Sequence, residues 1–355
     1  MRVVGYFPGW GTYARDFQVR DLHTSGAAGR LTHLLYAFGK VQNGRCAIGD
    51  AFADYRKPVP DGLPGTAAPA GNIGELRKLK ALYPHLRVLW SFGGWTGSAG
   101  FAGAARDTAT FADSCHRLLT DARWAGVFDG IDIDWEYPNA CGETCDTSGR
   151  DALARLLAAL RPRFGLVTAA VPGDVGKLSA TDYAGAAQHA DWLHAMTYDF
   201  AGTGSTSGPT LAHSPLTGYA GPRPTGTAAA TVGKLREAGV PAGKILLGVG
   251  FYGRGWTGVR SPEPGSAAAG PAPGTYQPGL EDYRVLSRRC PPTGTIGGTA
   301  YAVCGSQWWS YDTPATIAAK MAYARSQGLG GAFAWELSGD TDDADLLTAM
   351  ADGLS

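Results

Sequence analysis

The chain has 355 residues, 44% of them hydrophobic, and its 31 basic residues balance its 31 acidic residues. This length exceeds an ordinary single domain but suits one α/β barrel that carries an inserted piece. A net charge of zero gives no general attraction to nucleic acid or to an anionic membrane, and no apolar run approaches the ~20 residues of a membrane-spanning helix.

Short apolar runs recur along the chain, each closing in glycine, proline or an aromatic residue, with helix-period segments between them. The predicted strands cover residues 3–6, 31–38, 86–92, 130–134, 166–170, 192–197, 245–250 and 331–335, and apolar helix faces lie at 73–79, 111–122 and 153–160. This alternation predicts a (β/α)8 TIM barrel, in which reactive groups lie at the C-terminal ends of the strands. A doubly wound sheet is less favoured, because no glycine-rich phosphate fingerprint follows the first strand.

One segment, between Phe251 and the helix near Thr316, does not follow this alternation of strands and helices. It holds roughly sixty residues rich in glycine, proline, tyrosine and tryptophan, which is too long for an ordinary βα loop. We therefore predict a barrel domain at 1–255 and 313–355, with an inserted α+β subdomain at 256–312 that forms one wall of a cleft. A disordered linker is the alternative, favoured only for residues 261–274.

The six cysteines are even in number and show no zinc-site spacing, which predicts disulfides and an oxidising, extracellular compartment. Two pairs are close in sequence, which leaves a third, so the expected bridges are Cys141–Cys145, Cys290–Cys304 and Cys46–Cys115. Met1 leads directly into an apolar strand, so we expect that a secretory signal peptide has been removed.

The most informative segment is DGIDIDWEYP, residues 129–138. Side chains alternate along a strand, so Asp132, Asp134 and Glu136 share a face that points into the barrel. Barrel interiors are normally filled by valine, isoleucine and leucine, so three inward acids indicate function. Same-face neighbours are ~6.6 Å apart, so at least one acid should hold a proton and Glu136, the outermost, should have a raised pKa. A calcium site is less favoured, because oxygen-ligand loops are irregular and rich in glycine.

The segment resembles the signature of glycoside hydrolase family 18, which has two spaced aspartates, a third, and a glutamate before an aromatic residue. The matching residues are Asp129, Asp132, Asp134, Glu136 and Tyr137. SFGGW at 91–95, MTYD at 196–199 and FYGR at 251–254 resemble the family's third-, sixth- and seventh-strand motifs. GTYQPGLEDY at 274–283 resembles the inserted subdomain of deep-cleft chitinases. The likeness covers nearly the whole chain and is closest to bacterial chitinases of the actinomycete type.

The resemblance implies hydrolysis of the β-1,4 bonds of chitin with retention of configuration. The N-acetyl group of the sugar being cut attacks its own anomeric carbon while Glu136 protonates the leaving oxygen. Asp134 and Tyr198 would assist the acetamide group, and Asp132 would hold Asp134 in place. The expected substrate-binding residues are Tyr6, Phe38, Trp95, Tyr137, Met196, Asp199, Tyr252, Arg254 and Trp335, with Trp10 extending the platform.

The seven histidines form no cluster with metal spacing, so we expect neither a metal nor another cofactor. Ser91 and Ser114 lack a nucleophile elbow, which excludes a serine hydrolase. The expected partners are chitin and chito-oligosaccharides, with no nucleic acid or membrane, and we expect a secreted monomer.

Two other functions fit the same barrel. A chitin-binding lectin is disfavoured because Glu136 and its neighbouring acids are present. An endo-β-N-acetylglucosaminidase acting on N-glycans is disfavoured because an aromatic platform suits a long uniform chain better than a branched glycan.

Overall fold

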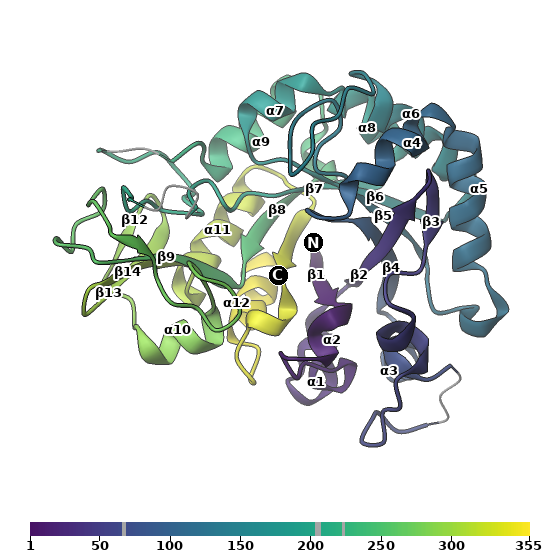
Figure 1. The fold of residues 1–355 in the computed structure, drawn as a ribbon, viewed down its shortest axis with the longest axis horizontal. Coiled ribbons are helices and arrows are strands. Elements are labelled where there is room, and N and C mark those ends of the chain that lie inside the picture. The colour runs from purple at the N-terminus through teal and green to yellow at the C-terminus, as the bar shows by residue number, and fades with distance from the viewer. Residues whose placement is uncertain (66–68, 203–206, 222–223) are drawn as a thin grey trace.

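The computed structural model describes residues 1–65, 69–202, 207–221 and 224–355 (Figure 1). Within this part of the chain eight parallel strands close into a barrel, since β1 at one end of the strand order pairs with β15 and also with β2 near the other end. The strands are β1 (Arg2–Pro8), β2 (His33–Gln42), β4 (Arg87–Gly93), β5 (Gly130–Asp134), β6 (Leu166–Val171), β7 (Trp192–Ala195), β8 (Ile245–Gly250) and β15 (Gly331–Trp335). The predicted TIM barrel is therefore confirmed.

Helices cover the outside of this barrel (Figure 1). Capping residues mark where these helices begin. The Asp107 side chain accepts a hydrogen bond from Thr110 N at 3.0 Å and caps the start of α5. Thr313 is the N-cap of α11, and Pro314 is its first residue. The helices are α1 (Val19–Thr24), α2 (Ala27–Arg30), α3 (Gly71–Leu82), α4 (Phe101–Arg106), α5 (Thr108–Leu119), α6 (Ala152–Leu160), α7 (Val175–Ala180), α8 (Tyr183–His189), α9 (Ala228–Glu237), α11 (Pro314–Ser326) and α12 (Asp345–Leu354).

Two apolar cores lie on the two faces of the barrel strands. The outer core fills the space between strands and helices and takes the apolar residues of β5 and its end, Ile131, Ile133 and Trp135. The inner core lies along the barrel axis and includes Val4, Tyr6, Leu35, Leu89, Trp192, Leu246 and Phe333. The period of two along β5 therefore places its acids on the inner side.

Three disulfides connect the predicted cysteine pairs. Cys46–Cys115 joins β3 (Arg45–Ala47), which pairs antiparallel with the end of β2, to helix α5. Cys141–Cys145 closes a short loop after β5, and Cys290–Cys304 closes a loop of the inserted region. Each bridge restricts a loop of the unfolded chain, most strongly the Cys46–Cys115 bridge with its separation of 69 residues.

A second, antiparallel sheet lies between β8 and α11 in sequence, at the left of the barrel in Figure 1. It contains β9 (Tyr252–Thr257), β10 (Gly270–Pro271), β11 (Leu280–Asp282), β12 (Gly294–Ile296), β13 (Thr299–Cys304) and β14 (Gln307–Tyr311), with α10 (Tyr283–Arg289) beside it. A boundary at residue 256 falls inside β9, so we propose that the inserted unit comprises 252–311. Among the described residues, no helix is both long and apolar enough to cross a membrane.

Candidate active site

A cavity of about 770 Å³ opens at the C-terminal end of the barrel strands. Two of the three acids of β5 and its end, Asp134 and Glu136, line it, whereas Asp132 lies fully buried beneath them. The cavity also contains Tyr198, the fourth expected catalytic residue, and most of the expected binding residues, namely Tyr6, Phe38, Trp95, Tyr137, Met196, Asp199, Arg254 and Trp335. These residues lie in β1, β2, β9 and β15 or follow β4, β5 and β7, so one cavity collects side chains from distant parts of the sequence.

Asp132 is surrounded by hydrogen-bond donors. Its Oδ2 accepts from Tyr6 Oη at 2.9 Å and from Ser91 Oγ at 2.7 Å. Its Oδ1 accepts from Thr168 Oγ1 at 2.6 Å and lies 3.4 Å from His194 Nδ1. Burial alone would raise the pKa of Asp132, but the interactions with His194, Thr168 and Ser91 hold that pKa below its ordinary value. Asp132 therefore stays ionised in the barrel interior.

A tryptophan sets the orientation of His194. Trp192 Nε1 donates to His194 Nε2 at 2.9 Å, and because an indole only donates, Nε2 must accept. This arrangement leaves the ring proton on Nδ1, the nitrogen that faces Asp132. Alternate residues of β7 thus form a chain of contacts that ends on the buried carboxylate.

Asp134 and Glu136 have the opposite electrostatic behaviour to Asp132. Burial, followed by the charges of Glu136 and Asp132, raises the pKa of Asp134 well above its ordinary value. Burial also raises the pKa of Glu136 to about 7, against opposing effects from Tyr137 and Lys177. Both carboxyls are therefore set up to hold protons near neutral pH, as a general acid requires.

The backbone of Glu136 is held by Ser98, in the 3-10 helix η3 (Ser98–Gly100). The Glu136 N–H donates to Ser98 Oγ at 2.8 Å, and Ser98 Oγ donates to the carbonyl oxygen of Gly94 at 2.8 Å. Ser98 is buried. The segment after β4 therefore fixes the position at which the acid leaves β5.

Tyr198 and Asp199 follow β7, two strands from β5 in the barrel, and line the same cavity. Arg254 donates to both oxygens of Asp199, with Nε–Oδ1 2.8 Å and Nη2–Oδ2 2.9 Å. Burial acts in the other direction, but Arg254 and His213 hold the pKa of Asp199 well below its ordinary value. Asp199 and Arg254 thus form a bidentate ion pair that presents polar atoms to the cavity.

Aromatic side chains form a continuous run at the β1, β2 and β15 side. Phe38 stacks against Trp335 with ring centroids 5.6 Å apart and against Trp10 at 5.9 Å. Tyr6 meets Trp335 edge to face at 5.3 Å. Trp95 is 50% exposed and Trp10 is 39% exposed. Apolar faces of this kind suit the flat, weakly polar faces of sugar rings.

Comparison with known proteins decides the family. The model described as Glycosyl hydrolases family 18 matches residues 2–340. The chain belongs to glycosyl hydrolase family 18. The family predicted from the motifs is thereby confirmed.

Three relatives place the chain within the family. It is 55% identical over 96% of its length to Chitinase C of Streptomyces lividans and 53% identical over 99% to Chitinase 63 of Streptomyces plicatus. The matched regions are 58% and 60% of those two proteins, so the chain spans less than two thirds of each. Its structure matches the catalytic domain of psychrophilic chitinase B from Arthrobacter TAD20 with a TM-score of 0.93 and 33% identity, over 99% of this chain and 95% of that chain. The expected actinomycete likeness is confirmed.

Some sequence-predicted residues of this family 18 barrel lie away from the cavity. Tyr252 is 4% exposed, packs against Tyr198 at 6.2 Å between ring centroids, and does not line the cavity. Asp129 precedes β5 at the far end of the strand and accepts from Lys80 Nζ at 2.7 Å. Three tryptophans of the inserted sheet are buried in it and do not line the cavity: Trp256, Trp308 and Trp309.

Sequence reasoning missed several residues that touch the acids or the cavity. Ser91, Thr168 and His194 contact Asp132, and the strand period could have identified them, because each is a polar residue on the inner face of a barrel strand. Ser98 carries no such signal. Neither does Lys177, which lines the cavity together with Asp174 and Gln277.

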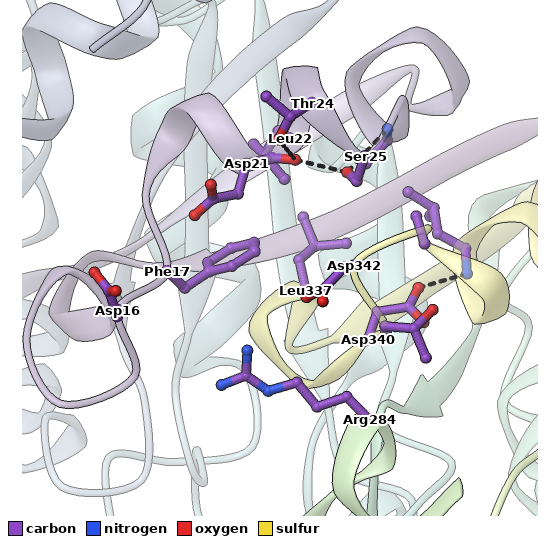
Figure 2. A pocket seen from close by; sticks show the side chains of 14 residues that line it. Asp16, Phe17, Asp21, Leu22, Thr24, Ser25, Arg284, Leu337, Asp340 and Asp342 are labelled. Carbon is purple, nitrogen blue, oxygen red and sulfur yellow. Dashed lines mark hydrogen bonds between the residues drawn. The ribbon is translucent and has the colours of Figure 1, made fainter. Parts of the chain in front are cut away.

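A smaller cavity of about 220 Å³ lies between the segments that follow β1 and β15 (Figure 2). Four aspartates line it beside Arg284: Asp16, Asp21, Asp340 and Asp342. Asp340 accepts hydrogen bonds from Leu346 N at 3.0 Å and Leu347 N at 2.9 Å, so it stabilises the start of α12. The described residues hold no group of three or more His, Cys, Asp and Glu side chains arranged for a metal. We assign this cavity no part in the reaction.

Proposed function

We propose that this chain is a chitinase that hydrolyses β-1,4-linked N-acetylglucosamine polymers with retention of configuration. The observation that carries the proposal is the position of Glu136, whose pKa is raised to about 7, at a cavity that also holds Asp134, Tyr198 and an aromatic floor. A protonated carboxyl beside a sugar-binding surface supplies the proton that the leaving oxygen needs. The names of the relatives agree with this activity.

The reaction needs no carboxylate nucleophile, and this family is an exception to the usual two-acid scheme. The acetamide oxygen of the bound sugar attacks its own anomeric carbon, the glycosidic C–O bond breaks, and the Glu136 proton passes to the leaving oxygen. Water then attacks the same carbon, the bond to the acetamide oxygen breaks, and Glu136 takes a proton back from water. Two inversions retain the configuration. Effective molarities of such intramolecular attacks reach ~10⁵ M or more.

Asp134 and Tyr198 orient the acetamide group in this scheme. Tyr198 donates its hydroxyl to the acetamide oxygen, and Asp134 accepts from the acetamide N–H as positive charge develops. Asp134 Oδ1 is buried without a hydrogen-bond partner among the described residues, so a donor from the substrate would satisfy it. Asp132, held ionised by its donors, keeps negative charge beneath the developing cation.

The remaining expected binding residues take roles by position. Trp335 offers the flat surface beneath the sugar that is cut, with Phe38, Trp10 and Tyr6 beside it. The sugar that is cut would be surrounded by Tyr137, Met196, Asp199 and Arg254, and Trp95 would extend the binding surface outward. Because Tyr252 lies behind Tyr198, we propose that it supports that tyrosine instead of touching the substrate.

The cellular setting follows from the same proposal. Three disulfides form and persist in oxidising compartments, so we propose secretion into the extracellular medium. The partners would be chitin and chito-oligosaccharides, bound by a monomer, with no role for nucleic acid, a membrane, a metal or another cofactor.

One experiment separates this proposal from its rivals. Incubation with N-acetylglucosamine oligomers and with a high-mannose glycoprotein should give shorter oligomers and leave the glycan intact. Release of sugar from the glycoprotein alone would instead identify an endo-β-N-acetylglucosaminidase. Binding to chitin with no product from either substrate would identify a lectin.

A further inference from the structure

A lysine in the cavity wall is not used by the mechanism above. Lys177 belongs to α7, the helix after β6, and lines the same cavity as Glu136. Its Nζ lies 4.1 Å from the centre of the Tyr137 ring, and Tyr137 follows Glu136 directly in the chain. The ammonium group is thus held beside the reacting acid by a cation–π contact.

The ammonium group of Lys177 has no bonded counter-ion among the described residues. Within the described residues it forms no ion pair with N–O 4.0 Å or shorter, whereas Arg254, the other cation of the cavity, is paired with Asp199. Asp174 is the nearest acid in sequence, but its Oδ1 accepts from the backbone N–H of Lys177 at 2.9 Å and so caps α7. Lys177 therefore presents its ammonium group, without a bonded counter-ion, to whatever fills this part of the cavity.

The position of Lys177 indicates which sugar meets this charge. The aromatic run of Trp335, Phe38 and Trp10 belongs to β1, β2 and β15 and their ends, whereas Tyr137 and Lys177 follow β5 and β6, across the barrel mouth. A chain that lay on the aromatic run and placed its scissile oxygen at Glu136 would direct its leaving part toward β5 and β6. In that orientation the leaving sugar would lie next to Lys177.

We propose that Lys177 is a specificity-determining residue that disfavours a protonated glucosamine as the leaving sugar. This inference rests on the proposed chitinase function and concerns the same cavity. N-acetylglucosamine is neutral, whereas the free amine of glucosamine carries a positive charge, so two like charges meet only when a deacetylated sugar occupies this position. The sugar on the other side of the bond must keep its acetyl group, because that group is the nucleophile.

The test uses a partially deacetylated chitosan of random sequence, at an acidic pH at which its amines are charged. Each cut leaves a new non-reducing end, and that end is the sugar that occupied the leaving position. Sequencing of the products by mass spectrometry therefore gives the fraction of glucosamine at new non-reducing ends. We expect this fraction to be low for the wild type and to rise about threefold to tenfold in Lys177→Met, which keeps the length of the side chain but removes its charge.

Matched variants make the result specific. Lys177→Arg keeps the charge and should retain the wild-type fraction. Lys234→Met in α9, which is outside the cavity lining, makes the same change in net charge and should also match the wild type. High salt should reduce the difference between wild type and Lys177→Met, because screening weakens the repulsion. An equal glucosamine fraction in wild type and Lys177→Met would overturn the proposal.

Failure of the inference is distinguishable from failure of the proposed function. If the wild type does not cut fully acetylated oligomers, the chitinase proposal itself is wrong. If it cuts them and Lys177→Met leaves the glucosamine fraction unchanged, only the role of Lys177 is wrong.

Discussion

The barrel interior and the junction between barrel and inserted sheet both bury charge, but they compensate it differently. At the junction, Lys320 Nζ lies 2.6 Å from Asp312 Oδ2 and also donates to the carbonyl oxygen of Ser214 at 2.6 Å. Ser214 and Thr316 donate to Asp312 as well, each at 2.8 Å. Opposite charge and hydrogen bonds satisfy both ions, so this pair connects α11 to the end of β14 and the segment at 214.

In the barrel interior Asp132 and Asp134 form no ion pair with a lysine or arginine among the described residues. Asp132 is stabilised by uncharged hydroxyl donors and by His194. Burial raises the pKa of Asp134 above it, and the charges of Glu136 and Asp132 add to that effect. A buried ion pair serves structure, whereas buried acids of like charge retain protons that can react. Residues of the junction are therefore expected to change stability, and residues of the interior to change rate.

The largest expected effect tests the interior. Glu136→Gln removes only the transferable proton, so turnover on chitin oligomers should fall by about 10³-fold or more while binding is retained. The measurement combines turnover with calorimetric binding of the oligomer. Retention of more than a tenth of wild-type turnover would refute the assignment of Glu136 as the proton donor.

The second prediction concerns the junction. Lys320→Met leaves Asp312 buried without its cation, so the free energy of unfolding should fall by about 3–5 kcal/mol. Denaturant unfolding measures this loss, and turnover per folded molecule should remain within a factor of two of the wild type, because the pair lies outside the cavity. Unchanged stability, or a loss of turnover without a loss of stability, would contradict the division between the two clusters.

A third prediction concerns the aromatic floor, which belongs to neither charge cluster. Trp335→Ala removes a stacking surface, so transition-state stabilisation should fall by about 2–3 kcal/mol, measured as kcat/KM on chitin oligomers. Trp309→Phe, a change inside the inserted sheet, is the matched control and should leave kcat/KM unchanged. If Trp335→Ala keeps both KM and kcat, the residue lies outside the substrate path.

The smallest effect concerns pH. Glu136 must be protonated to act, and its pKa is raised to about 7. The acid is therefore active below this pKa, and kcat/KM should decline by about tenfold per pH unit above it. A pH–rate profile of the wild type measures this decline on the alkaline side.

In Lys177→Met the alkaline decline of kcat/KM should move to higher pH, because Lys177 lowers the pKa of Glu136. If kcat/KM of the wild type already declined near the ordinary pKa of glutamate, the electrostatic description of the interior would be wrong.

Much of the fold was predictable because strand and helix periods are local properties. The eight barrel strands follow from apolar runs, and the inward direction of Asp132 and Asp134 follows from alternation along β5. The same alternation, applied to Thr168 in β6 and His194 in β7, could have identified the donors to Asp132. The beginning of the inserted sheet at Tyr252 could not be predicted from the sequence, because only one residue separates β9 from β8.

Other parts of the site depend on how loops fold back. Ser98 reaches Glu136 only because the chain turns after β4, and nothing in its neighbourhood signals that contact. Lys177 reaches Tyr137 because the short connection from β6, residues 172–174, brings α7 close to the end of the barrel. The motif predicts Tyr252 at the substrate, and in the structure this residue packs against Tyr198 and does not line the cavity. Contacts between loops of distant strands cannot be predicted from local sequence patterns, because they depend on how the whole chain folds.

The acetyl group of the substrate offers the most direct test, since that group is the nucleophile in the proposed mechanism. Initial rates on a chito-oligosaccharide and on its fully deacetylated counterpart of the same length should differ completely, with product from the first and none detectable from the second. Equal rates on the two oligomers would mean that some other nucleophile attacks the anomeric carbon, and the proposed roles of Glu136, Asp134 and Tyr198 would be wrong.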